Sequence, residues 1–157
     1  MVMGNKMTDN LDSKSISSLS VLLVEDNIAD ARLIEEFLKE ISINAVLHIV
    51  RDGKEAMDFL YLNCKYNGEC KSTFVILDLN LPKMSGREVL KEIKNDDELK
   101  RIPVVILTTS TAEEDINECY NNHANCYITK PLDFDEFANT MNSIKSFWFN
   151  MAELPKI

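Results

Sequence analysis

The stretch TFVILDLNLPKMSG, residues 73–86, places a carboxylate directly behind the most apolar run of the chain. Residues 74–77 are continuously apolar, as in a strand that is buried on both faces, and Asp78 follows them with no polar transition. Aspartate is a poor strand residue, and burying its charge without a partner costs several kcal/mol. We therefore interpret Asp78 as a functional group held at a rigid strand end.

Around this stretch, five short apolar runs alternate with five helical patterns. The predicted strands are residues 21–24, 45–50, 74–77, 104–107 and 126–129. Strict alternation of strands and helices is typical of a parallel sheet with right-handed crossovers and helices on both faces. The sequence therefore predicts a doubly wound α/β domain, and its longest predicted loop is residues 63–72.

Each predicted helix opens with a capping residue that is followed three positions later by an acid. A side-chain oxygen at the cap accepts a backbone N–H of the first turn, which has no partner inside the helix. The pairs are Asn27 and Asp30, Asp52 and Glu55, Ser85 and Glu88, Thr111 and Glu114, and Asp133 and Glu136. Ser85 and Thr111 fit the full capping-box pattern.

Length and composition narrow the class of protein. The chain has 157 residues and a net charge of −9, which disfavours binding to nucleic acid or to anionic lipid through the overall field. No apolar run approaches the roughly 18 residues of a membrane span, and residues 1–18 lack the apolar segment of a secretory signal. We expect a cytoplasmic protein with a disordered leader over residues 1–18, one domain over residues 19–150 and a tail over residues 151–157.

Cysteines occur at positions 64, 70, 119 and 126, and none of them forms a CxxC pair. Without an export signal, reduced thiols are expected. Cys64 and Cys70 flank a short segment and can clip a loop or bind a metal ion, but we interpret them as ordinary loop thiols.

Reactive side chains follow four of the five predicted strands. Ligands of such sheets bind beyond the carboxyl ends of the strands, so these side chains are expected to meet at one edge. They are Glu25 and Asp26 after the first strand, Asp78 after the third, Thr108 after the fourth and Lys130 after the fifth. One ammonium cannot balance three carboxylates, and Mg²⁺, which prefers oxygen ligands, would complete the balance. A carboxylate beside Mg²⁺, a lysine and a hydroxyl is equipped to accept a phosphoryl group as an acyl phosphate.

Four segments carry these residues, and together they resemble the receiver domain of two-component response regulators. The segments are LLVEDN, LDLNLPKMSG, PVVILTTS and CYITKP. The resemblance covers residues 19–150 and implies a flavodoxin-like (βα)5 fold, a five-stranded parallel sheet with strand order 2-1-3-4-5. It also implies a regulator that takes a phosphoryl group from a sensor histidine kinase in a Mg²⁺-dependent reaction, and because the residues after about 150 are too few for an output domain, we expect a single-domain regulator. The regulator would then signal through a conformational switch or pass the phosphate on in a phosphorelay.

The resemblance assigns roles at the acidic edge position by position. Asp78 matches the phosphoacceptor and Asp26 a direct Mg²⁺ ligand. Glu25 matches the acid that holds metal-bound water, and Asn80 matches the position whose backbone carbonyl binds the metal ion.

The remaining matched positions concern signalling. Thr108 matches the switch hydroxyl, Lys130 the lysine that pairs with the phosphate, and Tyr127 the aromatic side chain that changes orientation on activation. A looser similarity to stand-alone regulators of phytochrome-type kinases implies a homodimer through the face of helix four, strand five and helix five. Exposed aromatic residues at Phe134, Phe147 and Phe149 would mark an interface or else fold back on the core.

Two rival functions use the same ingredients. A haloacid-dehalogenase-type phosphatase needs a second acid two residues after its nucleophile, where this chain has Asn80. A pseudo-receiver would act as an interaction module without carrying phosphate, but such domains commonly lose an acid, the acceptor or the lysine. We therefore expect no enzymatic activity beyond the protein's own phosphorylation and dephosphorylation.

Overall fold

The computed structural model describes residues 19–39, 45–67 and 73–155, and the predicted leader lies outside them. Its centre is a five-stranded sheet in the order β2-β1-β3-β4-β5, with every neighbouring pair parallel. The strands are β1 (Ser20–Val24), β2 (Val46–Val50), β3 (Thr73–Leu77), β4 (Val104–Thr108) and β5 (Cys126–Thr129). The predicted flavodoxin-like α/β fold and its strand order are therefore confirmed.

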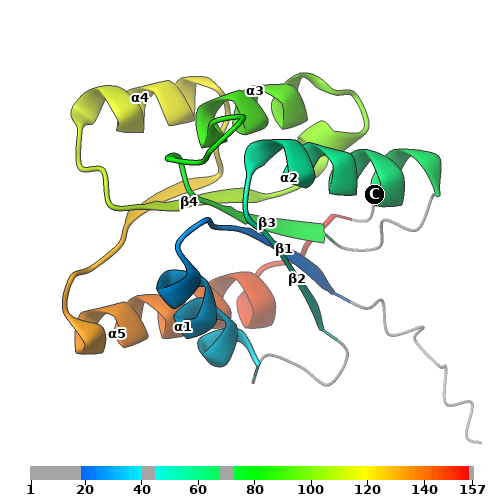
Figure 1. Ribbon diagram of the computed structural model, residues 1–157. Helices are drawn as coiled ribbons and strands as arrows, with labels where there is room; N and C mark the ends of the chain where they lie inside the picture. The colour runs from blue at the N-terminus through cyan, green and yellow to red at the C-terminus, as the bar shows by residue number, and fades with distance from the viewer. Residues whose placement is uncertain (1–18, 40–44, 68–72, 156–157) are drawn as a thin grey trace, which may run out of the picture.

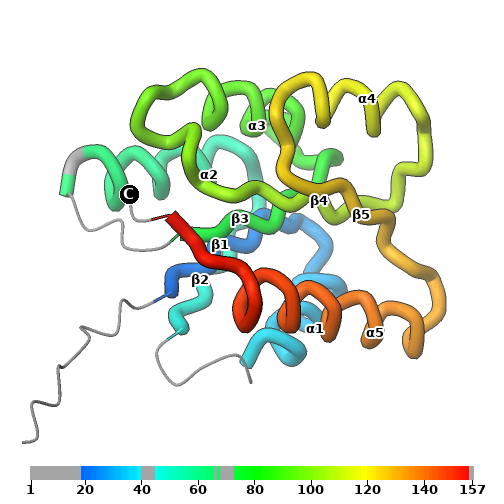
Figure 2. The backbone as a smooth tube through the Cα atoms, turned by 180° about the vertical axis from the view of Figure 1, so that it is seen from behind, coloured from blue at the N-terminus to red at the C-terminus, as the bar shows by residue number. Residues whose placement is uncertain are grey.

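Helices cover both faces of the sheet, as Figures 1 and 2 show from opposite sides. On one face lie α1 (Ile28–Leu38) and α5 (Phe134–Ile144), and on the other lie α2 (Gly53–Leu60), α3 (Gly86–Asn95) and α4 (Glu113–Asn121). Shorter helical turns are η1 (Tyr61–Tyr66) after α2, η2 (Leu99–Arg101) before β4 and η3 (Lys145–Met151) after α5. Among the helices that the structure describes, none has the length and apolar character needed to cross a membrane.

Successive residues of the central strands face opposite layers. In β3, Val75 and Leu77 belong to the core that includes α2 and α3, whereas Phe74 and Ile76 belong to the core that includes α1 and α5. Every residue of β3 is buried. Its interior residues 74–77 are all apolar, and the first charged side chain, Asp78, stands directly past the end of the strand.

Four of the five predicted helix caps are confirmed. Asn27, Asp52, Ser85 and Asp133 each accept a backbone N–H of the following turn, and Ser85 does so within a full capping box. The prediction is wrong for Thr111, because α4 is capped at Ala112 with no side-chain hydrogen bond. The Ser110 hydroxyl accepts the N–H of Ala112 at 3.3 Å, and the helix begins only after this turn.

The loop predicted over residues 63–72 is wrong in its first part, because η1 continues the helical path through residue 66. Leu60 and Cys64, one helical turn apart, are both buried against the same core, which explains the continuation. Cys64 is disulfide-bonded, so the interpretation as an ordinary loop thiol is also wrong. Cys70 lies outside the described residues, and Cys119 and Cys126 are free thiols.

The segment after α5 continues the helical path as η3 and packs against the sheet. The rings of Trp148 and Phe149 lie 5.2 and 5.0 Å from the ring of Phe74, which is fully buried. Phe149 is therefore a packing residue and not an exposed interface aromatic. Phe134 and Phe147 are 61% and 52% exposed and remain candidates for an interface.

Candidate functional site

The carboxyl edge of the sheet holds the predicted reactive residues in fixed places. The backbone N–H of Glu25 donates to a carbonyl of β2 at 3.0 Å, and that of Asp78 donates to a carbonyl of β1 at 3.1 Å. The N–H of Lys130 donates to the last carbonyl of β4 at 2.7 Å. Each residue thus extends its strand by one hydrogen bond, which brings the three side chains to the same edge.

Charged side chains gather at this edge in a group that we call the Lys130 cluster: Glu25, Asp26, Asp30, Asp78 and Lys130. Oxygens of Glu25, Asp26 and Asp78 all lie within 4.8 Å of one another. The Lys130 ammonium lies 2.6 Å from Glu25, 3.0 Å from Asp30 and 3.2 Å from Asp78. Three carboxylates therefore share one ammonium, and Asp26 adds a fourth negative charge beside them.

Burial makes this imbalance of charge costly. Desolvation, reinforced by the charge of Asp78, raises the pKa of Glu25 to about 7 despite its hydrogen bond from Lys130. Burial lowers the pKa of Lys130, but the hydrogen bond to Glu25 and the charges of Asp78 and Glu25 outweigh burial and raise it above its ordinary value. The cluster holds its lysine charged and still lacks positive charge.

The donor set fits a hard divalent cation. Glu25 and Asp78 are buried and Asp26 is exposed, so three carboxylates converge on a point that stays open to solvent on one side. Carboxylate oxygens with room for water are the surroundings that Mg²⁺ takes in proteins. The structure thus brings together the three predicted carboxylate ligands. Asn80, the fourth predicted ligand, is exposed on the loop after β3.

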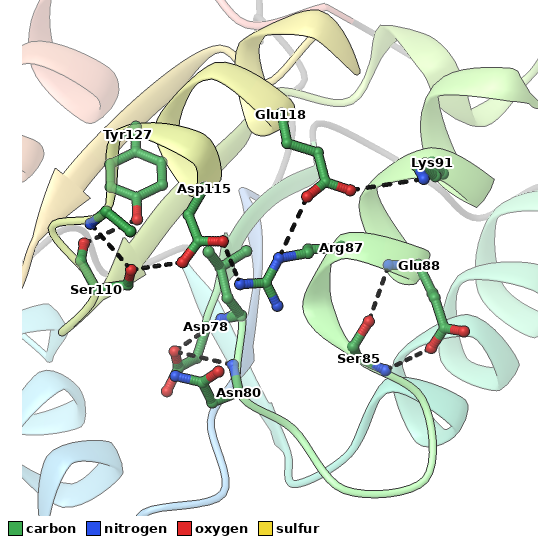
Figure 3. Close-up of polar contacts among 12 residues, drawn as sticks. Asp78, Asn80, Ser85, Arg87, Glu88, Lys91, Ser110, Asp115, Glu118 and Tyr127 are labelled. Atoms are coloured by element: carbon green, nitrogen blue, oxygen red, sulfur yellow. Dashed lines mark hydrogen bonds and ion pairs between the residues drawn. The ribbon is translucent and has the colours of Figure 1, made fainter.

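The loop after β3 fixes the carboxylate of Asp78. One oxygen, Oδ1, accepts the N–H of Leu79 at 2.7 Å and lies 3.5 Å from the N–H of Asn80 (Figure 3). The other oxygen, Oδ2, faces Lys130. Gly86 packs so closely that a Cβ there would lie 2.0 Å from the backbone oxygen of Asp78, so only glycine fits. The start of α3 is thereby tied to the loop that carries the acid.

Thr108 stands at the end of β4, and the environment of its side-chain hydroxyl is unusual. It is fully buried, and its Oγ1 has no hydrogen-bond partner among residues 19–39, 45–67 and 73–155. Leaving a buried hydroxyl unpaired costs about 1–3 kcal/mol. Such a hydroxyl is suited to donate to an oxygen atom that arrives from outside the chain.

A second set of polar contacts joins α3 to α4, and we call it the Arg87 network: Arg87, Lys91, Ser110, Asp115 and Glu118 (Figure 3). Arg87 pairs with Asp115 at 2.6 Å and with Glu118 at 3.5 Å, and Lys91 lies 3.6 Å from Glu118. The Ser110 hydroxyl donates to Asp115 at 2.5 Å. The network therefore anchors the loop between β4 and α4.

Tyr127 is connected to this loop rather than to the acids. Its hydroxyl donates to the backbone oxygen of Ser110 at 2.8 Å (Figure 3). Its backbone N–H donates to the Tyr120 hydroxyl at 3.1 Å. The predicted switch residue thus contacts the segment that directly follows Thr108.

Sequence reasoning missed two participants. Asp30 appeared only as the acid that follows a helix cap, yet its side chain pairs with Lys130, one hundred residues later in the chain. Arg87 was not singled out at all. Nothing in the local pattern distinguishes Asp30 from the other acids of first helical turns, because its role depends on where α1 lies against β5.

Comparisons with known proteins agree with this geometry. The family model described as the response regulator receiver domain matches residues 21–142. Response regulator Rcp1 of Synechocystis sp. is 47% identical over 135 residues, which cover 86% of this chain and 92% of Rcp1.

Solved structures of response regulators also match this chain. The crystal structure of the Mn²⁺-bound form of Rcp1 matches with a TM-score of 0.80 over 87% of this chain and 98% of the other. The crystal structure of the phosphorylated cyanobacterial phytochrome response regulator RcpA also matches with a TM-score of 0.80 and 47% identity, over 87% of this chain and 97% of the other.

Proposed function

This chain belongs to the family of response regulator receiver domains, and on that premise we propose that Asp78 accepts a phosphoryl group from a sensor histidine kinase. The observation that carries the proposal is the position of Lys130, whose ammonium touches Asp78 and Glu25 inside a buried acidic cluster.

We also propose that the receiver unit extends over residues 19–150. The packing of Trp148 on Phe74, beyond the segment 21–142 that matches the family model, supports this extent.

The reaction is a nucleophilic displacement at phosphorus. A carboxylate oxygen of Asp78 attacks the phosphorus atom of the donor phosphohistidine, and the new O–P bond forms as the P–N bond breaks. The imidazole nitrogen leaves with the electron pair, and Asp78 becomes an acyl phosphate. Beyond this reaction and the hydrolysis of its product, we propose no catalytic activity.

The surrounding residues stabilise the charge of the transferred group. Lys130 donates an N–H to one phosphoryl oxygen, and the Thr108 hydroxyl, which has no partner in the described part of the chain, donates to another. We propose Mg²⁺ as the cation held by the carboxylates of Glu25, Asp26 and Asp78 with the backbone carbonyl of Asn80. When bound, it neutralises charge on the phosphoryl oxygens.

Phosphorylation is read out through a shift between two conformations. A phosphoryl group on Asp78 favours the arrangement in which Thr108 and Lys130 both reach it. Because the Tyr127 hydroxyl is hydrogen-bonded to Ser110 in the loop that follows Thr108, we propose that the Tyr127 side chain reorients with that loop. The name of RcpA as a phytochrome response regulator supports a phytochrome-like kinase as the donor.

The test is phosphorylation by a small donor. Incubation with acetyl phosphate and Mg²⁺ is expected to add one phosphoryl group by mass spectrometry, and Asp78→Asn is expected to abolish the gain. Asp97→Asn is the matched control, because Asp97 is an exposed aspartate that pairs only with Lys100 among the ion pairs of the described residues. A mass gain that survives Asp78→Asn overturns the proposal.

We also propose a homodimer through α4, β5 and α5. Support comes from a hollow of about 390 Å³ that is lined in part by Ile128, Ile144 and Phe147. On the α4 side, Tyr120 is 48% exposed. Sedimentation is expected to detect a dimer in the wild type and a larger monomer fraction in Phe147→Ser. Equal dimer fractions in both proteins contradict this interface.

A further inference from the structure

The third partner of Lys130 has no role in the proposed reaction. A lysine ammonium has three N–H donors and no acceptor. In this structure the three lie within hydrogen-bond distance of Glu25 Oε2, Asp30 Oδ2 and Asp78 Oδ2. All donor capacity is therefore committed to carboxylates before a phosphoryl group arrives.

A phosphoryl oxygen on Asp78 can bind Lys130 fully only if one of these partners yields. Glu25 is 2% exposed and holds the shortest contact, so releasing it would leave a buried carboxylate without its cation. Asp30 is 32% exposed at its side chain, so water can replace the ammonium there at small cost. The ion pair with Asp30 is thus the one that Lys130 can lose at the smallest cost.

We propose that Asp30 is a positioning residue that competes with the phosphoryl group for Lys130, an inference that rests on the proposed function. The contact to Asp30 is shorter than the contact to Asp78, at 3.0 against 3.2 Å. Asp30 therefore draws the ammonium toward α1 while the site is unmodified. Its negative charge also opposes the arrival of an anionic group.

The surroundings of Asp30 supply a matched control. Asp30, Lys130 and Asp133 line the same hollow, which has a volume of about 390 Å³. Asp133 accepts the N–H of Asp135 at the start of α5, whereas the ion pairs of Lys130 are with Glu25, Asp30 and Asp78. Asp133→Asn removes the same charge from the same hollow and keeps an oxygen that can cap the helix.

The experiment measures binding of beryllofluoride, a stable mimic of the phosphoryl group, by ¹⁹F NMR at saturating Mg²⁺. We expect Asp30→Asn to bind beryllofluoride roughly threefold more tightly than the wild type, because one donor of Lys130 is freed. Asp30→Glu, which retains a carboxylate, is expected to return toward the wild-type affinity, and Asp133→Asn is expected to stay within about 1.5-fold of it. Saturating Mg²⁺ is needed because removal of Asp30 also weakens attraction of the cation.

A second readout needs no metal ion or phosphoryl mimic. In the metal-free protein, the ¹⁵Nζ signal of Lys130 is expected to shift in Asp30→Asn and Asp30→Ala, and to stay in place in Asp133→Asn. The Asp30→Ala variant also guards against an asparagine that still accepts from the lysine.

The outcomes separate this inference from the proposed function. If the wild type binds no beryllofluoride, the proposed function fails. If the wild type binds it and Asp78→Asn does not, the proposed function stands. In that case an Asp30→Asn affinity equal to or weaker than the wild type, or an equal gain in Asp133→Asn, overturns the competitor role of Asp30.

Discussion

The Lys130 cluster and the Arg87 network are both groups of charged side chains near Asp78, but their charges are balanced differently. The Lys130 cluster holds four carboxylates and a single ammonium, which contacts three of them. In the Arg87 network, two cations face two carboxylates, and the hydroxyl of Ser110 adds a further donor (Figure 3). The Lys130 cluster therefore carries an excess of negative charge, whereas the charges of the Arg87 network are balanced.

The pKa values of the acids follow this difference. Burial raises the pKa of Glu25 to about 7, because the shared lysine does not compensate for lost hydration. The hydrogen bond from Ser110, followed by that from Arg87, lowers the pKa of Asp115. An acid with a raised pKa in a buried cluster that is short of positive charge indicates a site suited to a cation, whereas the lowered pKa of Asp115 indicates an ion pair that holds two helices together.

Removal of Lys130 should give the largest effect. Lys130→Met leaves Glu25 and Asp78 buried without their cation, so we expect the metal-free protein to lose about 3 kcal/mol of unfolding free energy at pH 8. Mg²⁺ should restore part of the loss. Urea unfolding with and without Mg²⁺ measures both values.

The matching change in the Arg87 network is Lys91→Met. The Lys91 side chain is 51% exposed and its contact with Glu118 is long, at 3.6 Å. We expect a change of at most about 0.5 kcal/mol, with no dependence on Mg²⁺. Equal losses in the two variants would remove the distinction between the regions.

The second prediction concerns pH and Mg²⁺ affinity. Because the pKa of Glu25 is raised from 4.5 to about 7, its carboxyl is mostly protonated at pH 6 and mostly ionised at pH 8. Mg²⁺ affinity should therefore rise roughly tenfold between these pH values. Titration calorimetry at several pH values measures the change.

Two further considerations bear on whether Glu25 is the group whose titration causes this pH dependence. The folded-state pKa lies above the unfolded value, so Glu25 stabilises the metal-free protein below about pH 4.5 and this contribution is lost as pH rises through 7. Glu25→Gln should flatten the dependence of Mg²⁺ affinity on pH. An unchanged slope in this variant would assign the titration to another group.

The third prediction concerns the loss of the central cation of the Arg87 network. Arg87→Met removes one of the two partners of Asp115 and of Glu118, and the Arg87 side chain is 27% exposed. We expect a loss of about 1 kcal/mol in unfolding free energy, with Mg²⁺ affinity within about twofold of the wild type. A clear fall in the Mg²⁺ affinity of Arg87→Met would show that the two regions act as one.

The fold and most of the site could be predicted because the relevant signals are local. Asp78 follows a continuous apolar run, and the central strand it ends is buried on both faces. The order of strand ends along the chain then places Glu25, Thr108 and Lys130 at the same edge. These inferences need only the rule that parallel strands share a carboxyl edge.

What could not be predicted depends on contacts between distant elements. Ser110 and Thr111 are both good capping residues, and the bond from Ser110 to Asp115 is part of the arrangement that makes α4 begin later. The segment around Cys64 is loop-like in composition, yet burial beside Leu60 keeps it helical. The pairing of Asp30 with Lys130 requires the position of α1 relative to β5, which no local pattern encodes.

A further small effect is predicted at the start of α3, the helix that carries Arg87. The Ser85 hydroxyl accepts the N–H of Glu88 at 3.3 Å, and the Glu88 carboxylate accepts the N–H of Ser85 at 2.8 Å (Figure 3). Ser85→Ala should cost about 1 kcal/mol or less, and Ser85→Asp, which also caps, should recover most of it. Both variants should bind Mg²⁺ as the wild type does, because a helix cap adds no charge to the Lys130 cluster. Thermal unfolding and Mg²⁺ titration of the two variants test this, and a weaker Mg²⁺ affinity in Ser85→Ala would mean that the cap positions Asp78 through Gly86.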